Sequence, residues 1–474
     1  MIPIVTPDQM AAIDAAATEP VDVLIDRAGR AVAREALRML GGGYGRRVVV
    51  LEGKGNNGND GRAATRHLRS RGVRVAEFDA ASPPSTLPAT DLVIDAAYGT
   101  GFRGSFHAPR IADPTTPVLA VDIPSGVSGL TGTASGEPWH ADVTVTFAAL
   151  KPGLLVGDGP VYAGRIVVAD IGLDTSTEAR SHLVEAPDVA RWLPERPFDA
   201  HKWDEAVWVV AGSPGMTGAA HLCTRAAQRA GAGYVRLSTP GLPDDPGRPT
   251  EAVGHPLPEK EWSHELLGSL DRFRCLALGP GLGTSPDSAR AVRSTVARAR
   301  TALVVDGDGL TALGSDAAYA LRDRPSDSPL AVLTPHEGEF SRLGGSLLPD
   351  EDEADEAESR ADRFEAVRRV AAHTGGIVLL KGPTTLVAHP HGEVLAVTTG
   401  DERLATAGTG DVLTGIIAAL LAGDAEPFAA AAAAAWIHGR AGALAFARGL
   451  VAGDLVDHLP LVFAELDDRV PPSP

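Results

Sequence analysis

The chain has 474 residues, of which 44% are hydrophobic and 22% charged, so it is long enough to form two or three domains with full hydrophobic cores. Its formal net charge of −18 excludes the basic surface that a nucleic-acid binder, or a protein held on an anionic membrane, would need. Its only cysteines, Cys223 and Cys275, exclude a disulfide framework and a cysteine-based metal site.

The first third of the chain alternates short apolar runs with helical stretches. Helices are predicted at 7–17, 21–40 and 60–71, and strands at 47–52, 73–78, 91–95, 117–122 and 142–147. The strand segments are apolar throughout, as in a sheet that is buried on both faces. This pattern predicts the α/β fold class, with an N-terminal Rossmann-like, doubly wound domain.

A second α/β unit is predicted after a proline-containing linker at 187–205. Its strands are expected at 206–211, 233–238, 275–278, 302–306, 330–334 and 376–380, and its helices at 217–231, 286–299, 362–374, 409–422 and 425–447. The acidic segment 350–365 is typical of a solvated surface and is assigned no chemistry. The longest apolar run, 428–437, is about half a membrane span, and the N-terminus lacks the pattern of a secretory signal, so a cytoplasmic protein is expected.

A loop rich in glycine and asparagine follows the predicted strand 47–52. Its sequence, GKGNNGNDG, contains Asn56, Asn57 and Asn59, which are the only asparagines in the chain. A tight turn with a helix cap would need only one of them. Backbone N–H groups in such a turn can approach a phosphate at the helix start, although the loop is neither a GxGxxG motif nor a P-loop. The loop is therefore interpreted as a ligand-binding segment.

Polar residues also follow later strands of this sheet. Asp95, Asp122 and Lys151 come at or after predicted strand ends, and Ser125 follows Asp122 in a DIPSG segment. Ligands of an open α/β sheet bind beyond the carboxyl ends of the strands, so these residues and Asn57 are expected to share one crevice. Oxygen ligands from Asn, Asp and Ser suit a hard cation rather than zinc. For a single Asp, a turn-forming role is the alternative.

The order GxGNNGxDG, DAxxGTG, VDIPSG and KPGL resembles the NAD(P)H-hydrate epimerase family over residues 1–195. The resemblance implies a domain that binds K⁺ and hydrated NAD(P)H and interconverts the two epimers at the hydrated ring carbon. It places K⁺ on Asn57, Asp95 and Ser125. Asp122, with Lys151 as its partner, is expected to move the proton. The implied substrate-binding residues are Asn56, Asn57, Gly58, Asn59, Asp60, Gly99, Thr100, Gly101, Phe102, Arg103, Gly104, Ser105 and Asp122.

The C-terminal half has its own glycine-rich helix start, AGTGDVLTG at 407–415. Free N–H groups at such a start can hold a phosphoryl group. Asp411, in the first turn, is placed to accept a proton from an attacking hydroxyl. For this motif alone, a helix capped by Thr or Asp is the alternative.

Four more glycine-rich or polar segments end predicted strands of this half, namely GPGLG at 279–283, DGDGL at 306–310, TPHEGEF at 334–340 and KGPTT at 381–385. With AGTGDVL, this order resembles the NAD(P)H-hydrate dehydratases of the ribokinase-like fold. The resemblance implies that ADP phosphorylates the hydroxyl of the S-hydrate and that phosphate is then eliminated, with Asp411 as the base and Mg²⁺ as cofactor. The implied contacts are Ala219, Gly283, His336 and Asp411 with the hydrated dinucleotide, and Lys381, Gly382, Pro383, Thr384, Thr385 and Gly410 with the nucleotide.

The sequence therefore predicts a bifunctional repair enzyme with an epimerase domain at 1–195 and a dehydratase domain at 200–474. Its partners are expected to be the small molecules NADHX, NADPHX and ADP and further copies of itself, with no nucleic acid and no membrane. Two alternatives stay open: a ribokinase-type kinase that releases a stable phosphate ester, and an N-terminal domain that binds its ligand without catalysis. Departures from the family pattern at 203–205 and 400–402 leave local substrate contacts open.

Overall fold

The computed structural model describes residues 1–345 and 362–468, which form two compact units. One unit contains residues 2–181, and the other contains most of the chain from residue 182 onward. Residues 350–361 of the acidic segment lie outside the described residues, so the expectation of a solvated surface there stays a prediction.

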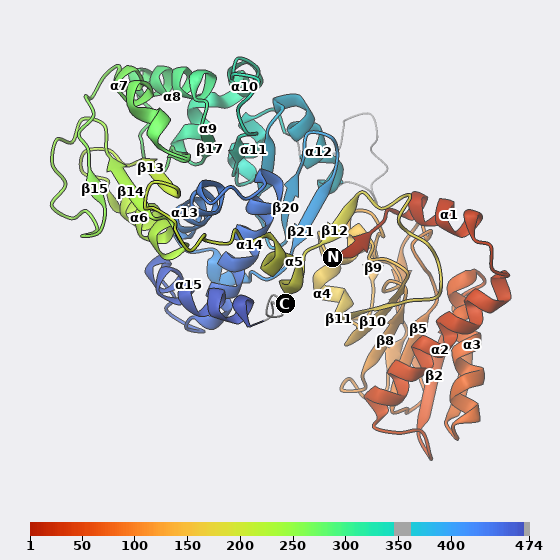
Figure 1. Cartoon of the computed structure of the whole chain (residues 1–474). Coiled ribbons are helices and arrows are strands. Elements are labelled where there is room, and N and C mark those ends of the chain that lie inside the picture. The colour runs from red at the N-terminus through yellow and green to blue at the C-terminus, as the bar shows by residue number, and fades with distance from the viewer. Residues whose placement is uncertain (346–361, 469–474) are drawn as a thin grey trace. The chain divides into compact units, whose positions relative to one another are not determined.

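The N-terminal unit is built on a parallel sheet with the strand order β11-β10-β8-β5-β2-β3 (Figure 1). Its strands are β2 (Arg47–Glu52), β3 (Arg74–Asp79), β5 (Leu92–Ala96), β8 (Val118–Val121), β10 (Val143–Phe147) and β11 (Arg165–Ala169). The first five lie within one residue of the predicted strands, and all adjacent pairs are parallel. The doubly wound α/β prediction is confirmed.

Both faces of this sheet are covered. Val48 and Val50 of β2 pack in the core with α2 (Val21–Leu40) and α3 (Asn56–Ser70), whereas Val49 packs on the other face. The short pairs β4 (Thr86–Leu87) with β7 (Arg110–Ile111), and β6 (Phe106–His107) with β9 (Gly136–Glu137), lie among the remaining segments. The unit also contains β1 (Ile2–Ile4), α1 (Pro7–Ala16), η1 (Pro152–Leu154) and α4 (Gly159–Ala163).

Helix α3 begins earlier than predicted. It starts at Asn56 rather than at residue 60, so the asparagine-rich segment forms the first turn of the helix instead of a loop before it. Gly58 permits this, because a Cβ there would lie 1.9 Å from the carbonyl oxygen of Gly53. The first turn therefore packs directly on the end of β2.

The C-terminal unit contains a larger sheet in the order β12-β21-β20-β19-β18-β17-β16-β13-β14-β15. Its strands are β12 (Ser181–Leu183), β13 (Ala206–Val210), β14 (Tyr234–Ser238), β15 (Val253–Gly254), β16 (Cys275–Leu278), β17 (Ala302–Val305), β18 (Val332–Leu333), β19 (Ile377–Leu380), β20 (Thr385–Ala388) and β21 (Val394–Val397). The pairs from β15 to β19 are parallel, whereas β20 pairs with β19 and β21 in antiparallel fashion. The hairpin β20–β21 was not predicted.

Helices pack on this sheet to form the largest core of the unit. One group comprises α6 (Gly218–Arg229), α13 (Thr409–Ala422), α14 (Pro427–Leu444) and α15 (Ala452–Asp467). Figure 1 shows α7 (Trp262–Ser269), α8 (Pro286–Arg298), α9 (Asp308–Leu313) and α10 (Ala317–Arg322) across the strands from that group, with α11 (Glu337–Arg342) and α12 (Arg363–Thr374) farther along the sheet. Short helices η2 (Leu270–Arg272), η3 (Gly314–Asp316) and η4 (Glu402–Leu404) connect these elements.

The alanine run at 428–437 lies inside α14, and its central alanines are fully buried. Small side chains let this helix pack closely on its neighbours. Within residues 1–345 and 362–468, no helix has the combined length and apolarity needed to span a membrane.

The predicted linker 187–205 is partly helical, which corrects that expectation. Helix α5 (Ala186–Trp192) begins with a capping box formed by Glu185 and Asp188. The family departure at 203–205 has a packing role, because Trp203 stacks on Tyr234 with ring centroids 4.3 Å apart.

Candidate active sites

The N-terminal unit has a cavity at its topological switch point. Strand β2 lies between β3, the next strand along the chain, and β5, so the chain leaves β2 in opposite directions. Such a point opens a crevice at the carboxyl ends of the strands. A cavity of about 580 Å³ lies there. The expected residues that line it are Asn56, Asn57, Asp60, Gly99, Thr100, Gly101, Phe102, Arg103, Asp122 and Lys151.

The other expected residues of this site lie outside the cavity lining. Gly58 supports the start of α3, as described above. Asn59 Oδ1 accepts a hydrogen bond from Arg62 Nη2 at 2.6 Å. Ser105 Oγ lies 3.2 Å from His107 Nε2, and Gly104 adopts a positive φ beside it. Their assignment to substrate binding stays a prediction.

Asp122 and Lys151 form a buried ion pair in the cavity wall. Lys151 Nζ lies 2.6 Å from Asp122 Oδ1 and also donates to Thr146 Oγ1 at 2.9 Å and to the carbonyl oxygen of Phe147 at 3.2 Å. The Lys151 side chain is only 1% exposed. A buried ammonium is costly unless it is paired and hydrogen-bonded, so these partners fix it in one place. The carboxylate of Asp122 is thereby held at the cavity in one orientation.

The backbone of Asp122 is strained. Its φ is +65°, a left-handed value that costs a non-glycine residue about 1–3 kcal/mol. A 2.7 Å hydrogen bond from its N–H to the carbonyl oxygen of Val145 helps to hold this conformation. Strained residues of this kind persist where the surrounding structure holds them in place, and they are common at active sites.

Two further carboxyl groups share the cavity. Burial, and then the charges of Asp122 and Asp14, raises the pKa of Asp60 to about 8, although Lys151 opposes this. Burial also raises the pKa of Asp14. Asp60 is therefore protonated at neutral pH and can donate a hydrogen bond to a ligand oxygen. Sequence reasoning missed Asp14, because its position on α1 belongs to no motif.

The three residues expected to hold K⁺ lie around the segment that follows β5. Ser125 Oγ donates to Asp95 Oδ1 at 2.6 Å, and the N–H of Tyr98 donates to Ser125 Oγ at 2.9 Å. A Cβ on the next residue, Gly99, would lie 3.5 Å from the Cβ of Asn57. Both polar atoms of the Asn57 amide are buried with no hydrogen-bond partner in the described part of the chain. Leaving a buried amide without a hydrogen-bond partner costs about 1–3 kcal/mol. The site therefore fits a ligand that binds to the amide oxygen of Asn57.

In the C-terminal unit, α13 begins within the GTGD motif. Gly408 has a φ of +93°, and a Cβ there would lie 2.6 Å from Leu222 Cδ1, so the turn requires glycine. No side chain caps this end among the described residues, which leaves first-turn N–H groups for an anion. His438 of α14 donates from Nε2 to the carbonyl oxygen of Thr409 at 2.9 Å. Burial lowers the pKa of His438 to about 4, so the ring stays neutral; no motif pointed to it.

Asp411, in the first turn of α13, has a pKa that suits a general base. Burial, and then the charge of Asp306, raises the pKa of Asp411 to about 7, while Lys381 lowers it. A base works best when its pKa lies near the operating pH.

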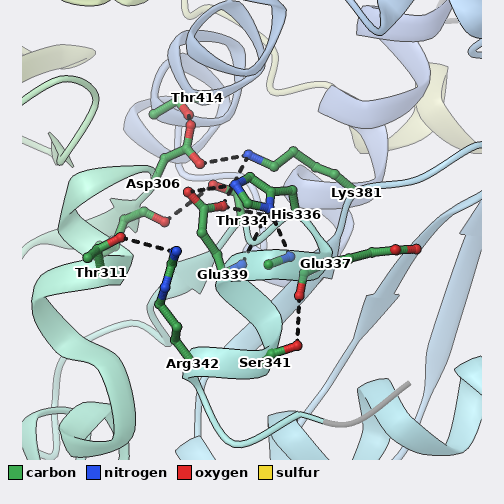
Figure 2. A network of polar contacts seen from close by, with 12 residues as sticks. Asp306, Thr311, Thr334, His336, Glu337, Glu339, Ser341, Arg342, Lys381 and Thr414 are labelled. Carbon is green, nitrogen blue, oxygen red and sulfur yellow. Dashed lines mark hydrogen bonds and ion pairs between the residues drawn. The ribbon is translucent and has the colours of Figure 1, made fainter. Parts of the chain in front are cut away.

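Figure 2 shows a polar network beneath this helix start. Lys381 Nζ lies 2.8 Å from Asp306 Oδ1 and 3.9 Å from Glu339 Oε2. Thr414 Oγ1, from α13, donates to Asp306 Oδ2 at 2.8 Å. Burial alone lowers the pKa of Lys381, but the two carboxylates raise it above its ordinary value. A Cβ on Gly410 would lie 3.4 Å from Lys381 Nζ, so these two expected nucleotide contacts are neighbours.

His336 is the N-cap of α11. Its Nδ1 accepts from the N–H groups of Gly338 and Glu339, at 3.0 and 3.4 Å, and the N–H of His336 donates to Glu339 Oε2 at 2.9 Å. With Nδ1 an acceptor, the ring proton is on Nε2. The predicted contact therefore also has a structural role.

The remaining residues expected to contact the substrate or the nucleotide lie in or beside the 279–283 loop and in the segment at the start of β20. A Cβ on Gly281 would lie 3.4 Å from Ala219 Cβ, which places the 279–283 loop beside α6. Gly283 donates from its N–H to Asp308 Oδ2 at 2.8 Å. Thr385 begins β20, and the other members of the KGPTT segment form the turn before it, namely Lys381, Gly382, Pro383 and Thr384.

The described ranges contain acidic, histidine and cysteine side chains, which are the types that most often hold a resident metal ion. No group of three or more such side chains there is arranged to hold a metal ion. The described part of the C-terminal site therefore has no carboxylate cluster of that size for Mg²⁺.

Comparisons with known proteins cover both halves of the chain. A family model described as NAD(P)H-hydrate dehydratase matches residues 207–461, and one described as YjeF-related protein N-terminus matches 21–88 and 76–153. The bifunctional NAD(P)H-hydrate repair enzyme Nnr of Moorella thermoacetica is 36% identical over 98% of each chain. That of Salinibacter ruber is 35% identical over 98% of this chain and 96% of its own. A solved structure of the ADP/ATP-dependent NAD(P)H-hydrate dehydratase from Bacillus subtilis is 29% identical, covers 60% of this chain and 97% of its own, and has a TM-score of 0.48.

Proposed function

The chain belongs to the family of bifunctional NAD(P)H-hydrate repair enzymes, and we propose that its two sites perform successive steps on one substrate. It combines a Rossmann-like epimerase domain with a ribokinase-like dehydratase domain. The resemblance stated from the motifs is confirmed by these matches. The observation that carries the proposal is that each unit has its own strand-end site, with a Lys–Asp ion pair in which one partner is buried. We assign the epimerase to the expected domain 1–195, of which residues 182–195 belong to the C-terminal unit in the structure, and the dehydratase to 200–474.

In the epimerase, the substrate occupies the cavity at the switch point. Asp122, oriented by Lys151, moves the proton at the hydrated ring carbon. Asp60, which is protonated at neutral pH, donates a hydrogen bond to the bound hydrate. First-turn N–H groups of α3 meet the dinucleotide phosphates.

In the dehydratase, ADP transfers its β-phosphoryl group to the hydroxyl of the S-hydrate, and the hydroxyl proton passes to Asp411. The C–O bond then breaks, phosphate leaves with the bonding electrons, and the adjacent ring carbon loses a proton, which restores the double bond of NAD(P)H. The products are NAD(P)H, AMP and phosphate. The N–H groups at the start of α13 hold the transferred phosphoryl group, and Lys381 and Gly410 contact the nucleotide.

The two metal ions differ in how the chain accommodates them. K⁺ fits Asn57, Asp95 and Ser125, because the Asn57 amide is buried and unpartnered within the described ranges. When bound there, K⁺ supplies positive charge beside the substrate. Mg²⁺ is expected to arrive with the nucleotide phosphates, as it usually does in phosphoryl transfer. We further propose a cytoplasmic homo-oligomer.

The test is recovery of absorbance at 340 nm. A mixture of R- and S-hydrated NADH is incubated with the protein and Mg²⁺, with ADP or ATP in separate arms and with K⁺ present or replaced by tetramethylammonium. We expect full recovery with ADP and K⁺, and recovery of only the S portion when epimerisation is prevented by Asp122→Ala. Matched Asp316→Asn, an exposed residue, serves as the control.

Two results would contradict the proposal. Accumulation of a stable phosphorylated alcohol without NADH would indicate a kinase instead. Unchanged use of the R epimer by Asp122→Ala would indicate that the N-terminal domain binds its ligand without catalysis.

A further inference from the structure

Asp306 is at the centre of the C-terminal network, although the family resemblance implies no contact between it and either substrate. It directly follows β17 and is 2% exposed. Its two carboxylate oxygens are bound by different parts of the chain: Oδ1 by Lys381 Nζ and Oδ2 by Thr414 Oγ1, each at 2.8 Å. Figure 2 shows both contacts. One buried side chain thus joins the segment after β19 to the helix that carries Asp411.

The contact with Lys381 fixes where its ammonium points. An ammonium has three donors. One is used on Asp306 Oδ1, and Glu339 Oε2 lies 3.9 Å from Nζ, which leaves a donor for an incoming oxygen. Gly410 is a close neighbour of this ammonium, because a Cβ on Gly410 would be in ordinary van der Waals contact with Nζ, at 3.4 Å. Lys381 is therefore presented to the nucleotide by its carboxylate partner.

The contact with Thr414 fixes the helix start. Thr414 lies one turn after Gly410, and its Oγ1, whose proton is shared with Asp306, also lies 3.1 Å from the carbonyl oxygen of Gly410. Holding Thr414 on Asp306 therefore sets the position of the first turn of α13 on the sheet. Asp411 belongs to that turn.

We propose that Asp306 is a positioning residue that couples the nucleotide-binding lysine to the catalytic base. Through Lys381 it sets nucleotide affinity, and through Thr414 it sets the placement of Asp411. The inference rests on the proposed function of this site and adds to it a residue that touches neither substrate.

The charges around Asp411 make the proposal measurable by pH. Asp306 and Lys381 face it from the ends of β17 and β19 with opposite effects, and Cys223 faces it from α6. Burial raises the pKa of Cys223, so that thiol stays uncharged at neutral pH. His438 of α14 is also neutral. Loss of the Asp306 charge is therefore expected to make Asp411 more acidic.

The experiment compares Asp306→Asn, Thr414→Val and Thr414→Ser with the wild type. Thr311→Val on α9 is the matched control, because Thr311 contacts Arg342 rather than Asp306. Asp306→Asn is expected to weaken ADP binding, measured by calorimetry, by about tenfold or more, and to move the acidic limb of the dehydration profile to lower pH. Thr414→Val is expected to lower kcat with nearly unchanged ADP affinity, and Thr414→Ser to restore it.

The proposal is overturned if Asp306→Asn binds ADP as the wild type does and keeps the acidic limb in place. It is equally overturned if Thr414→Val behaves like Thr311→Val, a comparison that decides the matter when Asp306→Asn does not fold. ADP binding is measured without the hydrated dinucleotide. A wild type that binds ADP but does not restore NADH would therefore contradict the proposed function and leave the coupling to be judged by the binding data.

Discussion

Replacing Asp411 by Asn is expected to abolish dehydration and to stabilise the C-terminal unit above neutral pH. The pKa of Asp411 rises from 3.8 in the unfolded chain to about 7 in the folded protein, mainly through burial and then through Asp306. A folded-state pKa that is raised favours folding at low pH, and the benefit is lost as the pH rises through the folded value. The ionised carboxylate at pH 8 therefore destabilises the fold, and the neutral amide does not.

The magnitude follows from the shift. About three pKa units correspond to an upper limit of about 4 kcal/mol, and the partial exposure of Asp411 reduces this to about 1–2 kcal/mol. For a unit of this size, the melting temperature of Asp411→Asn at pH 8 is expected to be higher than that of the wild type by roughly 2–6 °C. At pH 4 the two melting temperatures should differ much less, because the wild-type carboxyl is then protonated in the folded state and about half protonated in the unfolded chain.

Two assays check this reasoning. Scanning calorimetry from pH 4 to pH 8 compares the wild type, Asp411→Asn and the exposed control Asp316→Asn. In parallel, kcat/KM for dehydration by the wild type should rise about tenfold per pH unit up to about pH 7 and then level off. The reasoning is refuted if Asp411→Asn shows the same dependence of melting temperature on pH as the wild type, or if dehydration shows no rise below pH 7.

Three further predictions concern the other groups. Lys151→Met removes the partner that orients Asp122, so epimerisation is expected to fall about a hundredfold or more while dehydration of the pure S epimer is unchanged; equal loss of both activities would contradict this. Wild-type epimerisation is expected to decline above about pH 8, where Asp60 ionises beside Asp122. Asp60→Asn should retain activity without that decline, and a pH profile of epimerisation measures both. Gly408→Ala places a Cβ at a φ of +93° and 2.6 Å from Leu222, so it should lower stability by about 1–3 kcal/mol in urea titrations and slow dehydration; a variant as stable as the wild type would contradict the required turn.

The fold was predictable where local pattern and burial agree. The apolar run 47–52 forms β2 as predicted, because every residue after Arg47 is buried. The predicted helix 409–422 has the same first and last residues as α13. The hairpin β20–β21 was missed, since its strands are only four residues long and no Asn-Gly turn joins them. Helix α5 was not predicted, because the prolines in and after it indicated a linker.

The sites were predictable only as far as motifs extend. Asp122 and Lys151 were both named, and the structure joins them. Asp14 and His438 were not, because each enters its site from a helix without a motif of its own, and only tertiary packing brings it there. Acidity was equally out of reach: the pKa of Asp60 depends on burial and on carboxylates distant in sequence.

The two units share one physical solution, and it explains an oddity of composition. Of 43 basic residues only five are lysine, yet each site contains a Lys–Asp pair with one buried partner, and a threonine hydroxyl also contacts each pair. An ammonium suits these places because it is compact and directs its donors in different directions, as the four acceptors around Lys151 require. A guanidinium presents a flat fork instead, whereas the ammonium of Lys381 places one donor on Asp306 Oδ1 and directs its other donors elsewhere. In a chain that otherwise uses arginine for positive charge, lysine at these two positions follows from the geometry of the acceptors rather than from the need for charge.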